Sequence, residues 1–188
     1  METFITSDTH AYHKNITKGV SEWESGTMRD FKDQYEMTSV MVDNINRMVG
    51  ENDVIYHLGD WSFGGFDKVK EFRDRIVCKN IHLVFGNHDA HIRKNRDDCQ
   101  KLFSSVHSDL LVRLCGKTFH MYHYPLSSWQ DIGDGGINLY GHCHGNYKLN
   151  RGKQMDVGMD TNGLSPYHIS EIIDRMDKIE IEKVDHHA

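Results

Sequence analysis

Hydrophobic and polar residues alternate with two different periods through the first half of the chain. Short apolar runs bounded by glycine or polar residues are typical of buried strands. Between these runs, apolar residues recur near the 3.6-residue period of an amphipathic helix, and Gly50 stands where the first such helix should end. This alternation favours βαβ units and a largely parallel sheet. The predicted order is strand 2–6, helix 37–49, strand 53–58, a helix carrying Val69, Phe72 and Ile76, and strand 80–85.

The second half of the chain has a different pattern. Alternation around Cys115-Gly116 predicts a β-hairpin, and Ser170 is placed to act as the N-cap of the last helix. The polar, glycine-interrupted interval 16–34 is expected to be a long loop. We expect one α/β domain over residues 1–188, parallel first and antiparallel later. The elements predicted in this half are a helix at 91–103, hairpin strands at 108–114 and 117–122, strands at 137–140 and 154–158, a helix at 170–177 and a strand in the tail 179–188.

Histidine is unusually frequent in this sequence. The 188 residues include 14 histidines, where a usage of about 2% would give roughly four. Histidine is rarely chosen to fill a core, so this excess points to a metal site or to acid–base chemistry. The formal net charge of -6 argues against a module that binds nucleic acid by neutralising many phosphates.

The first residues of the chain and its cysteines indicate the cellular compartment in which we expect the protein. The opening Met1-Glu2-Thr3 has no basic region or long apolar segment, so no signal peptide is predicted, and no apolar run is long enough to span a membrane. The four cysteines lie far apart with no C-x-x-C pair, which predicts neither a disulfide framework nor a zinc ribbon. We therefore expect a protein of the reducing cytoplasm with no membrane partner.

Polar clusters follow the predicted strands one after another. In an open α/β sheet, groups just beyond the carboxyl ends of strands converge on one crevice. Asp8 and His10, like His142 and His144, are two residues apart, so in extended chain each pair should point the same way. A mixture of carboxylate, imidazole and amide ligands suits Mn, Fe, Ni or Zn better than Ca or Mg. The clusters are Asp8-Thr9-His10, Gly59-Asp60, Gly86-Asn87-His88-Asp89, His123-Tyr124-Pro125 and Gly141-His142-Cys143-His144.

In this order, the clusters resemble the motifs of the calcineurin-like metallophosphoesterase superfamily: D-x-H, G-D, G-N-H-[DE], a lone His and G-H-x-H. They span residues 8–144. The resemblance implies an α/β fold in which mixed β-sheets pack as a sandwich flanked by helices. It also implies two divalent metal ions. Asp8, His10 and His144 would bind the first ion, Asn87, His123 and His142 would bind the second, and Asp60 would bridge both.

The same resemblance implies a mechanism. Two cations about 3.5–4 Å apart would hold a bridging hydroxide that attacks the phosphorus of a phosphoester. His88 resembles the mobile catalytic histidine of the family, which would stabilise the transition state or protonate the leaving oxygen, with Asp89 as its supporting partner.

Several of these residues have a second interpretation. Asp8 could simply cap a turn, Asn87 could be only a turn former, and His120 competes with His123 for the lone-histidine motif. The run His13-Lys14-Asn15-Ile16 resembles small bacterial and phage members of the family. His13 and Asn15 either contact the substrate phosphate or stabilise their loop.

The metal motifs do not identify the substrate. We expect a small phosphodiester or phosphomonoester, with a nucleotide favoured, and manganese as the metal, with iron, nickel or zinc as alternatives. The intervals 16–34 and 126–136 are expected to determine specificity. Two other functions stay open: a non-catalytic interaction scaffold on the same fold, and a nuclease, which the net charge of -6 disfavours.

Overall fold

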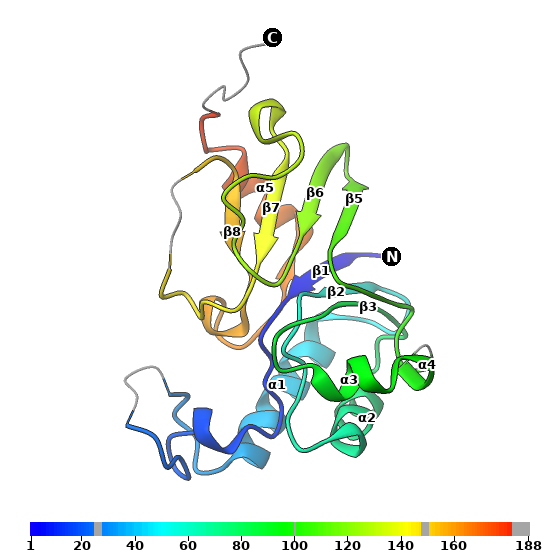
Figure 1. The fold of residues 1–188 in the computed structure, drawn as a ribbon, viewed down its shortest axis with the longest axis vertical. Coiled ribbons are helices and arrows are strands. Elements are labelled where there is room, and N and C mark those ends of the chain that lie inside the picture. The colour runs from blue at the N-terminus through cyan, green and yellow to red at the C-terminus, as the bar shows by residue number, and fades with distance from the viewer. Residues whose placement is uncertain (25–27, 100, 148–150, 182–188) are drawn as a thin grey trace.

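The computed structural model describes residues 1–24, 28–99, 101–147 and 151–181. It contains two mixed sheets with helices packed around them (Figure 1). The first sheet has the strand order β4-β3-β2-β1-β9, in which β1 to β4 run parallel and β9 is antiparallel to β1. This confirms the predicted parallel arrangement of the first half. The strands are β1 (Thr3–Thr6), β2 (Val54–His57), β3 (Asn80–Val84), β4 (Ser105–His107) and β9 (Tyr167–His168).

The second sheet has the order β5-β6-β7-β8. The predicted hairpin is present, since β5 and β6 are antiparallel, but β6 pairs with β7 and β7 with β8 in parallel. The expectation of an antiparallel second half was therefore wrong beyond the hairpin, because long connections return the chain to the same end of the sheet before β7 and β8. The strands are β5 (Leu110–Leu114), β6 (Lys117–Met121), β7 (Ile137–Tyr140) and β8 (Gln154–Asp156).

The α-helices with an assigned N-cap begin directly after a polar residue or a glycine. At the start of α1, the Asp33 carboxylate accepts hydrogen bonds from the backbone N–H groups of Tyr35 and Glu36 at 2.9 and 2.8 Å. No helix in the described part of the chain has the length and apolar character needed to cross a membrane. The α-helices are α1 (Gln34–Met48), α2 (Phe66–Arg75), α3 (Ala90–Lys94), α4 (Arg96–Cys99) and α5 (Ile169–Met176), and the 3-10 helices are η1 (Lys14–Ile16), η2 (Ile132–Asp134) and η3 (Met159–Thr161).

Two helix predictions were wrong in detail. The single helix expected at 91–103 is divided into α3 and α4, because Asn95 ends the first by donating from its side chain to the His91 carbonyl at 2.7 Å. The cap of α5 is His168 rather than Ser170. The His168 ring accepts from the Ser170 N–H, and Glu171 accepts from the His168 N–H at 3.0 Å, which forms a capping box.

Short strands were the elements that the pattern missed. Neither β4 nor β9 was predicted, because two or three residues give no measurable period. The strand predicted at 179–188 falls largely outside the described residues. Within its described residues, the interval 16–34 is irregular as expected, apart from the end of η1, the first residue of α1 and one isolated bridge between Thr17 and Arg29.

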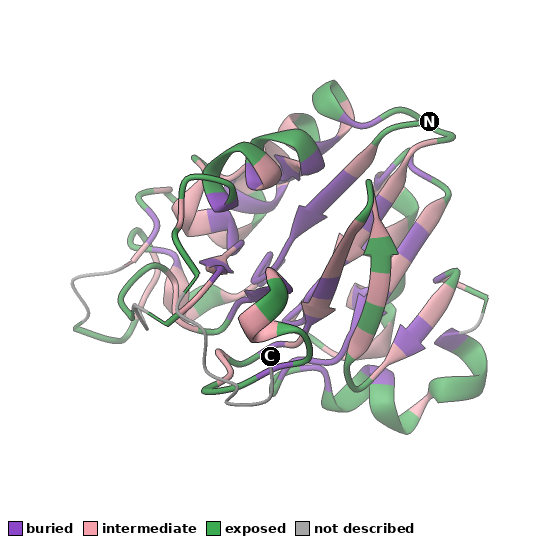
Figure 2. Ribbon diagram, turned by 90° about the horizontal axis from the view of Figure 1, so that it is seen from above, coloured by how far each residue is buried: buried purple, intermediate pink, exposed green. Residues whose placement is uncertain are grey.

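The first sheet is buried on both faces. Successive residues point to opposite sides, so Phe4 lies in a core shared with α1 and α2, whereas Ile5 lies in a core shared with the second sheet. Figure 2 shows the consequence, with buried strands inside and helices exposed along their outer faces. This sandwich leaves the carboxyl ends of the central strands open at one edge.

Candidate metal centre

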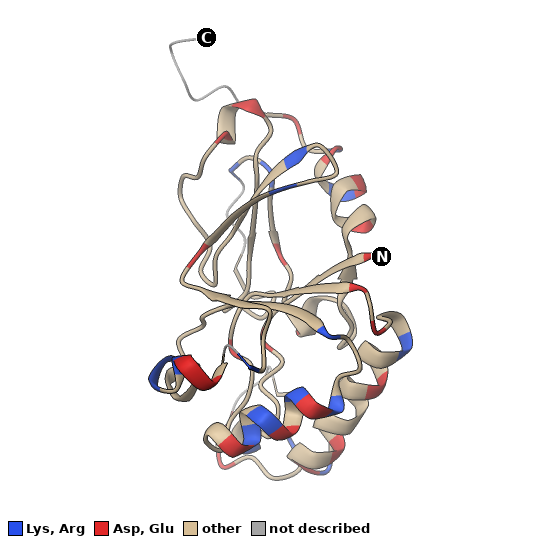
Figure 3. Cartoon of the chain, turned by 90° about the vertical axis from the view of Figure 1, so that its right-hand side faces the viewer, with Lys and Arg blue, Asp and Glu red and all other residues tan. Residues whose placement is uncertain are grey.

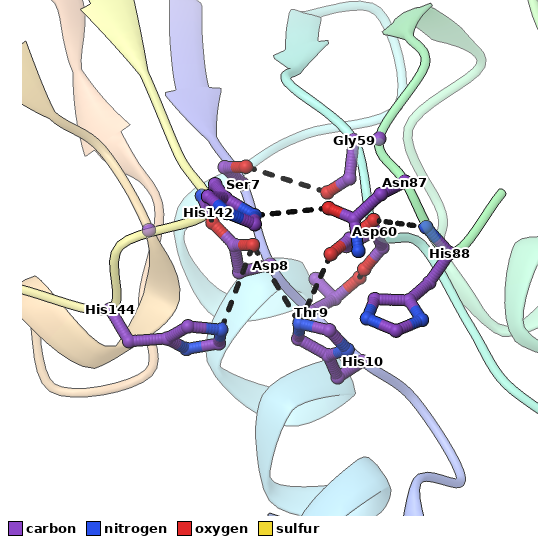
Figure 4. A network of polar contacts seen from close by, with 12 residues as sticks. Ser7, Asp8, Thr9, His10, Gly59, Asp60, Asn87, His88, His142 and His144 are labelled. Atoms are coloured by element: carbon purple, nitrogen blue, oxygen red, sulfur yellow. Dashed lines mark hydrogen bonds and ion pairs between the residues drawn. The ribbon is translucent and has the colours of Figure 1, made fainter. Parts of the chain in front are cut away.

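Polar side chains that follow strands of both sheets meet at this edge, and Figure 4 shows many of them. They follow β1, β2, β3, β6 and β7, so residues more than 130 positions apart are neighbours, as in the hydrogen bond from the His142 N–H to Asp8 Oδ2 at 2.9 Å. The topology thus brings together the polar clusters that were singled out in the sequence.

The first cluster consists of Asp8, His10 and His144. Each offers one ligand atom, and these atoms lie within 4.8 Å of one another. Asp8 Oδ1 is 3.6 Å from His10 Nε2 and 3.9 Å from His144 Nε2. Asp8 and His10 are 0% and 3% exposed, so the cluster is closed off from solvent on their side.

The second cluster consists of Asp60, Asn87, His123 and His142. Ligand atoms of its carboxylate and two imidazoles also lie within 4.8 Å of one another. Asn87 Oδ1 is 2.9 Å from His123 Nε2 and 3.0 Å from His142 Nδ1. His123 is buried, but Asn87 and His142 are exposed. His120, the sequence competitor of His123, lies away from this cluster and pairs with Asp109 at 3.6 Å.

Asp60 lies between the two clusters. Its Oδ2 atom is 3.5 Å from His10 Nε2 and 3.4 Å from His123 Nε2. Its Oδ1 atom accepts a hydrogen bond from the His88 N–H at 2.8 Å, which fixes the carboxylate in this orientation. One carboxylate oxygen therefore faces both groups of ligand atoms.

The backbone at these residues is not extended. Five residues of the two clusters have φ in the left-handed region: Asp8 at 55°, His10 at 46°, Asp60 at 57°, His142 at 67° and His144 at 49°. The expectation that paired residues converge because the chain is extended was therefore wrong; left-handed turns bring them together. Each costs about 1–2 kcal/mol for a residue with a side chain. Strain of this kind persists where the surrounding structure enforces it, typically at functional sites.

Two glycines make room for the carboxylates. A Cβ at Gly86 would collide with the Asp60 carboxylate, and a Cβ at Gly141 would collide with the Asp8 carboxylate and the Ser7 hydroxyl. The glycines that precede the Asn87 and His142 motifs are therefore required by close approach.

Buried residues beneath the centre hold its turns. Asp89, expected to partner His88, instead accepts three backbone N–H bonds, from Gly86, Asp60 and Trp61 at 2.7, 2.8 and 2.9 Å. It ties the turn after β2 to the turn after β3.

His57 joins the turn after β1 to the turn after β2. Its Nδ1 accepts from the Gly59 N–H at 3.2 Å, which leaves Nε2 to donate to the Thr9 hydroxyl at 3.0 Å, and Thr9 donates on to the Trp61 carbonyl at 2.7 Å. This buried histidine is structural, as its place within a strand indicates.

Two further residues lie beside the first cluster, Arg29 and Asp160, and neither was predicted from the sequence. Asp160 Oδ2 accepts from His144 Nδ1 at 2.6 Å, and Arg29 binds both oxygens of the same carboxylate. Asp160 follows β8, so the rule that polar residues gather after strands could have found it. Nothing in the pattern around Arg29 marks it, because it lies in the irregular interval 16–34.

The charges of the two clusters suit the binding of a cation. Burial opposes ionisation of Asp8 and Asp60, but the surrounding imidazoles outweigh it, so both carboxyl pKa values lie below their usual range. Burial lowers the pKa of His10. Burial also acts against charge on His123 and His144, but Asp60 and Asp160 respectively outweigh it and raise the pKa of these rings. A metal ion that takes these nitrogens would therefore release protons.

Buried polar atoms without a hydrogen-bond partner show whether the residues of the first cluster suit a metal ion. Asp8 Oδ1 and both ring nitrogens of His10 are buried and have no hydrogen-bond partner among the described residues. Such atoms cost about 1–3 kcal/mol each when nothing satisfies them. An ionised carboxylate and neutral imidazoles that face one point are the donors that a divalent transition metal prefers. The residues therefore fit a metal ion at the first cluster.

A cavity of about 200 Å³ opens beside the first cluster. Its lining includes His13, Asn15 and Trp23 together with His10, His88 and His144. The His13 ring stacks on Phe63 with centroids 3.7 Å apart, and burial lowers its pKa to about 4. Asn15 Oδ1 accepts from the Glu22 N–H at 3.3 Å, so it stabilises its loop while it faces the cavity.

Comparisons with known proteins agree with this geometry. A family model, the calcineurin-like phosphoesterase superfamily domain, matches residues 1–157. An uncharacterized protein of Methanocaldococcus jannaschii is 28% identical over 183 residues, which cover 93% of this chain and 91% of that protein. A crystal structure of a protein of unknown function from Aquifex aeolicus has the same fold, with a TM-score of 0.68, 20% identity and coverage of 93% of this chain and 98% of that chain. A structure of an archaeal phosphodiesterase matches with a TM-score of 0.49 at 20% identity over 84% of this chain and 82% of that chain.

Proposed function

The chain belongs to the calcineurin-like phosphoesterase superfamily, and from this premise we propose that it hydrolyses a small phosphoester with two divalent cations held by the two clusters. Membership of the family makes it a hydrolase of ester bonds that depends on metal ions. What we propose beyond family membership is the number of ions, the role of each residue and the class of substrate.

The observation that carries the proposal is the shared Asp60 carboxylate. Its Oδ2 atom lies 3.5 and 3.4 Å from ligand nitrogens of the first and second clusters. A ligand set divided in this way around one oxygen is suited to two ions side by side rather than to one. Asp8, His10 and His144 would hold the first ion, and Asn87, His123 and His142 the second, with Asp60 shared.

The side chains then divide the chemistry. Two cations bound by these residues would supply a water-derived nucleophile at neutral pH and would neutralise charge on the phosphoryl oxygens. His88 is exposed beside the first cluster, with its ring centroid 5.6 Å from that of His10, so it can reach an ester bound there. It would donate a proton to the leaving oxygen or a hydrogen bond to the phosphoryl group. The backbone N–H of His88 also donates a hydrogen bond to Asp60, so the same residue holds the shared carboxylate in place.

The cavity beside the first cluster supports a small substrate. No Lys or Arg is among the described residues that line it, and the aromatic rings of His13 and Trp23, which lie edge to face with centroids 5.7 Å apart, are part of its lining. An uncharged planar group such as a nucleobase stacks on such rings. A long polyanion would need cations there, and Figure 3 shows Lys and Arg mixed with Asp and Glu along the helices rather than gathered in a basic stripe. We therefore favour a nucleotide or small diester over a polynucleotide.

The ligand side chains bear on the type of metal, and the cysteines bear on the cellular compartment. The mixture of imidazole, carboxylate and amide donors favours manganese, with iron, nickel or zinc as alternatives. All four cysteines are free, and Cys115 is exposed, which supports a reducing compartment such as the cytoplasm.

Metal reconstitution tests the function. Protein stripped with a chelator and reloaded with Mn²⁺ should cleave an aryl phosphomonoester, the matching diester or a member of a nucleotide panel. The variant His88→Ala should keep both ions and lose about 10²–10⁴-fold in rate. His91→Ala, an exposed histidine three residues further on, is the matched control and should keep the rate.

Two results would contradict the proposal in different ways. Protein that takes up no Mn²⁺, Ni²⁺ or Zn²⁺ by elemental analysis and cleaves no ester would be an interaction scaffold. Protein that takes up metal but cleaves only polynucleotides would be a nuclease.

A further inference from the structure

Arg29 is a buried cation with no contact to any proposed metal ligand side chain among the described residues. It lies in the irregular interval between η1 and α1, yet its side chain is only 3% exposed. Its Nε and Nη2 atoms donate to the two carboxylate oxygens of Asp160, both at 2.8 Å. The planar guanidinium and the carboxylate are therefore matched as a bidentate pair.

Arg29 also donates to two backbone carbonyls beside the first cluster. Nη1 donates to the Thr9 carbonyl at 2.8 Å, and Nη2 donates to the Asp8 carbonyl at 2.6 Å. Asp8 is one of the residues in the left-handed conformation. Arg29 thus stabilises the turn that aims the Asp8 carboxylate.

Asp160 continues the chain of contacts to His144. Its Oδ2 atom lies 2.6 Å from His144 Nδ1, so this nitrogen carries the proton and donates it to the carboxylate. The lone pair of Nε2 is then left on the side that faces Asp8 Oδ1, 3.9 Å away. A carboxylate behind a histidine ligand fixes the tautomer and the ring orientation in this way.

Stability alone is a weak reason for this arrangement. A buried ion pair is often no more stabilising than apolar residues of the same volume, because both charges lose their hydration. Apolar residues, however, could neither orient an imidazole nor bind two carbonyls at fixed distances. The Arg29–Asp160 pair is therefore better explained by the positions that it imposes on the His144 ring and on the two carbonyls than by a gain in stability.

We propose that Arg29 and Asp160 are positioning residues that set the affinity of the first cluster for its cation by fixing His144 and the Asp8 turn. This inference rests on the proposed function. It also explains why a residue from the interval 16–34 is buried against the centre: the backbone of Arg29 bonds to Ile16 and Lys18, so the same side chain ties that interval to the cluster.

Isothermal titration with Mn²⁺ tests the proposal, with electron paramagnetic resonance to count bound ions. Asp160→Asn keeps the size of the side chain and loses its charge, and should weaken binding of one ion about 10–100-fold while the other is unchanged. Arg29→Lys keeps the charge but loses the fork, so it should weaken the same ion by a smaller factor. Asp177→Asn removes a carboxylate that pairs with Lys117 and Lys153 on the surface and should change neither affinity.

The outcomes separate this inference from the proposed function. Wild-type protein that binds none of Mn²⁺, Ni²⁺ and Zn²⁺ overturns both. Wild-type protein that binds two ions, together with an Asp160→Asn variant that is less stable but binds both with unchanged affinity, overturns the inference alone, because the pair would then be merely structural. If neither variant folds, ¹⁵N NMR of the Zn²⁺-loaded wild type decides: a proton on His144 Nδ1 supports the proposal, and an unprotonated Nδ1 overturns it.

Discussion

The two clusters of the centre are built differently. In the first, Asp8 and His10 are buried and several of their polar atoms have no partner among the described residues. In the second, Asn87 and His142 are exposed, and Asn87 Oδ1 already lies at hydrogen-bond distance from both imidazoles. The first cluster is thus shielded from solvent and positioned before a cation binds. The second cluster is open to solvent, and its polar atoms already pair with one another.

This difference predicts different affinities. A cation at the first cluster relieves buried atoms that otherwise have no partner, so its binding gains what their isolation costs. A cation at the second cluster must displace hydrogen bonds and solvent. We therefore expect the first ion to be held more tightly and the second ion to exchange more readily.

The largest effect is expected where the two clusters overlap. Asp60→Asn should lower the rate about 10³-fold or more, equivalent to about 4 kcal/mol of transition-state stabilisation, because it weakens both ions at once. Elemental analysis should find fewer than two ions per chain. Asn at position 60 keeps the oxygen that accepts from the His88 N–H only in one amide orientation, so circular dichroism should verify the fold.

A variant that loses one ion and keeps near-normal rates would contradict the shared role of Asp60. Asp109→Asn is a suitable control, since Asp109 is 59% exposed and lies by His120, away from the centre. It should leave both rate and metal content unchanged.

Thermal unfolding with and without metal compares the clusters directly. At a free Mn²⁺ concentration 100 times the dissociation constant, an ion stabilises the native state by about 2.7 kcal/mol. For a chain of this length, that corresponds to a rise in Tm of about 5–10 °C. Asp8→Asn should lose most of this rise at low Mn²⁺. Without metal it should also be somewhat less stable than wild type at pH 7, because a folded-state pKa below the usual range means that the ionised carboxylate stabilises the fold.

His142→Ala is the counterpart of this variant in the second cluster. It should keep most of the rise in Tm at low Mn²⁺, because the first cluster is intact. Equal losses in both variants would show that the two ions bind with similar affinity and that burial does not distinguish the clusters.

Asp89 offers a smaller effect that acts on stability. Asp89→Asn leaves one acceptor oxygen for three buried N–H donors, so at least one donor is left without a partner. The expected cost is about 2 kcal/mol, measured as a lower urea midpoint with unchanged m value. Unchanged stability would mean that the turns after β2 and β3 do not depend on this carboxylate.

Much of the centre could be predicted because its chemistry follows strands. Residues at the carboxyl ends of parallel strands must lie near one another, whatever their separation in sequence, so Asp8, Asp60 and Asn87 were placed together correctly. The local geometry could not be predicted in the same way. Positive φ at His142 and His144 depends on tertiary contacts rather than on pattern.

The residues that were missed fall into two kinds. Asp160 obeys the strand-end rule, because it follows a strand that was predicted at 154–158, but it stands outside the five polar clusters that were singled out. Arg29 obeys no local rule, because a buried arginine is determined by the carboxylate and carbonyls that it meets in the folded chain. Periodicity likewise predicted the long elements, whereas β4, β9 and the break at Asn95 depend on single contacts.

The smallest effect concerns a residue beneath both clusters. Burial lowers the pKa of His57 to about 3, so this ring stays neutral in the folded chain. In the unfolded chain it takes up a proton as the pH falls through about 6.5. Between these values the unfolded state binds more protons, so the stability that neutral His57 contributes is present above pH 6.5 and is lost as the pH falls, by up to about 1.4 kcal/mol per unit.

Urea unfolding of chelated protein at pH 7 and pH 5 measures this loss. His57→Gln should be about 1–2 kcal/mol less stable than wild type at pH 7, because the bonds to Gly59 and Thr9 are disturbed. At pH 5 the gap should close or reverse, since Gln has no proton to exclude. Ile81→Val removes one buried methyl group without a titrating side chain and should be about 1 kcal/mol less stable at both pH values. A His57→Gln gap that is equally wide at pH 5 would mean that the buried ring takes up its proton without unfolding, and that the floor beneath the two clusters is wetter than its burial indicates.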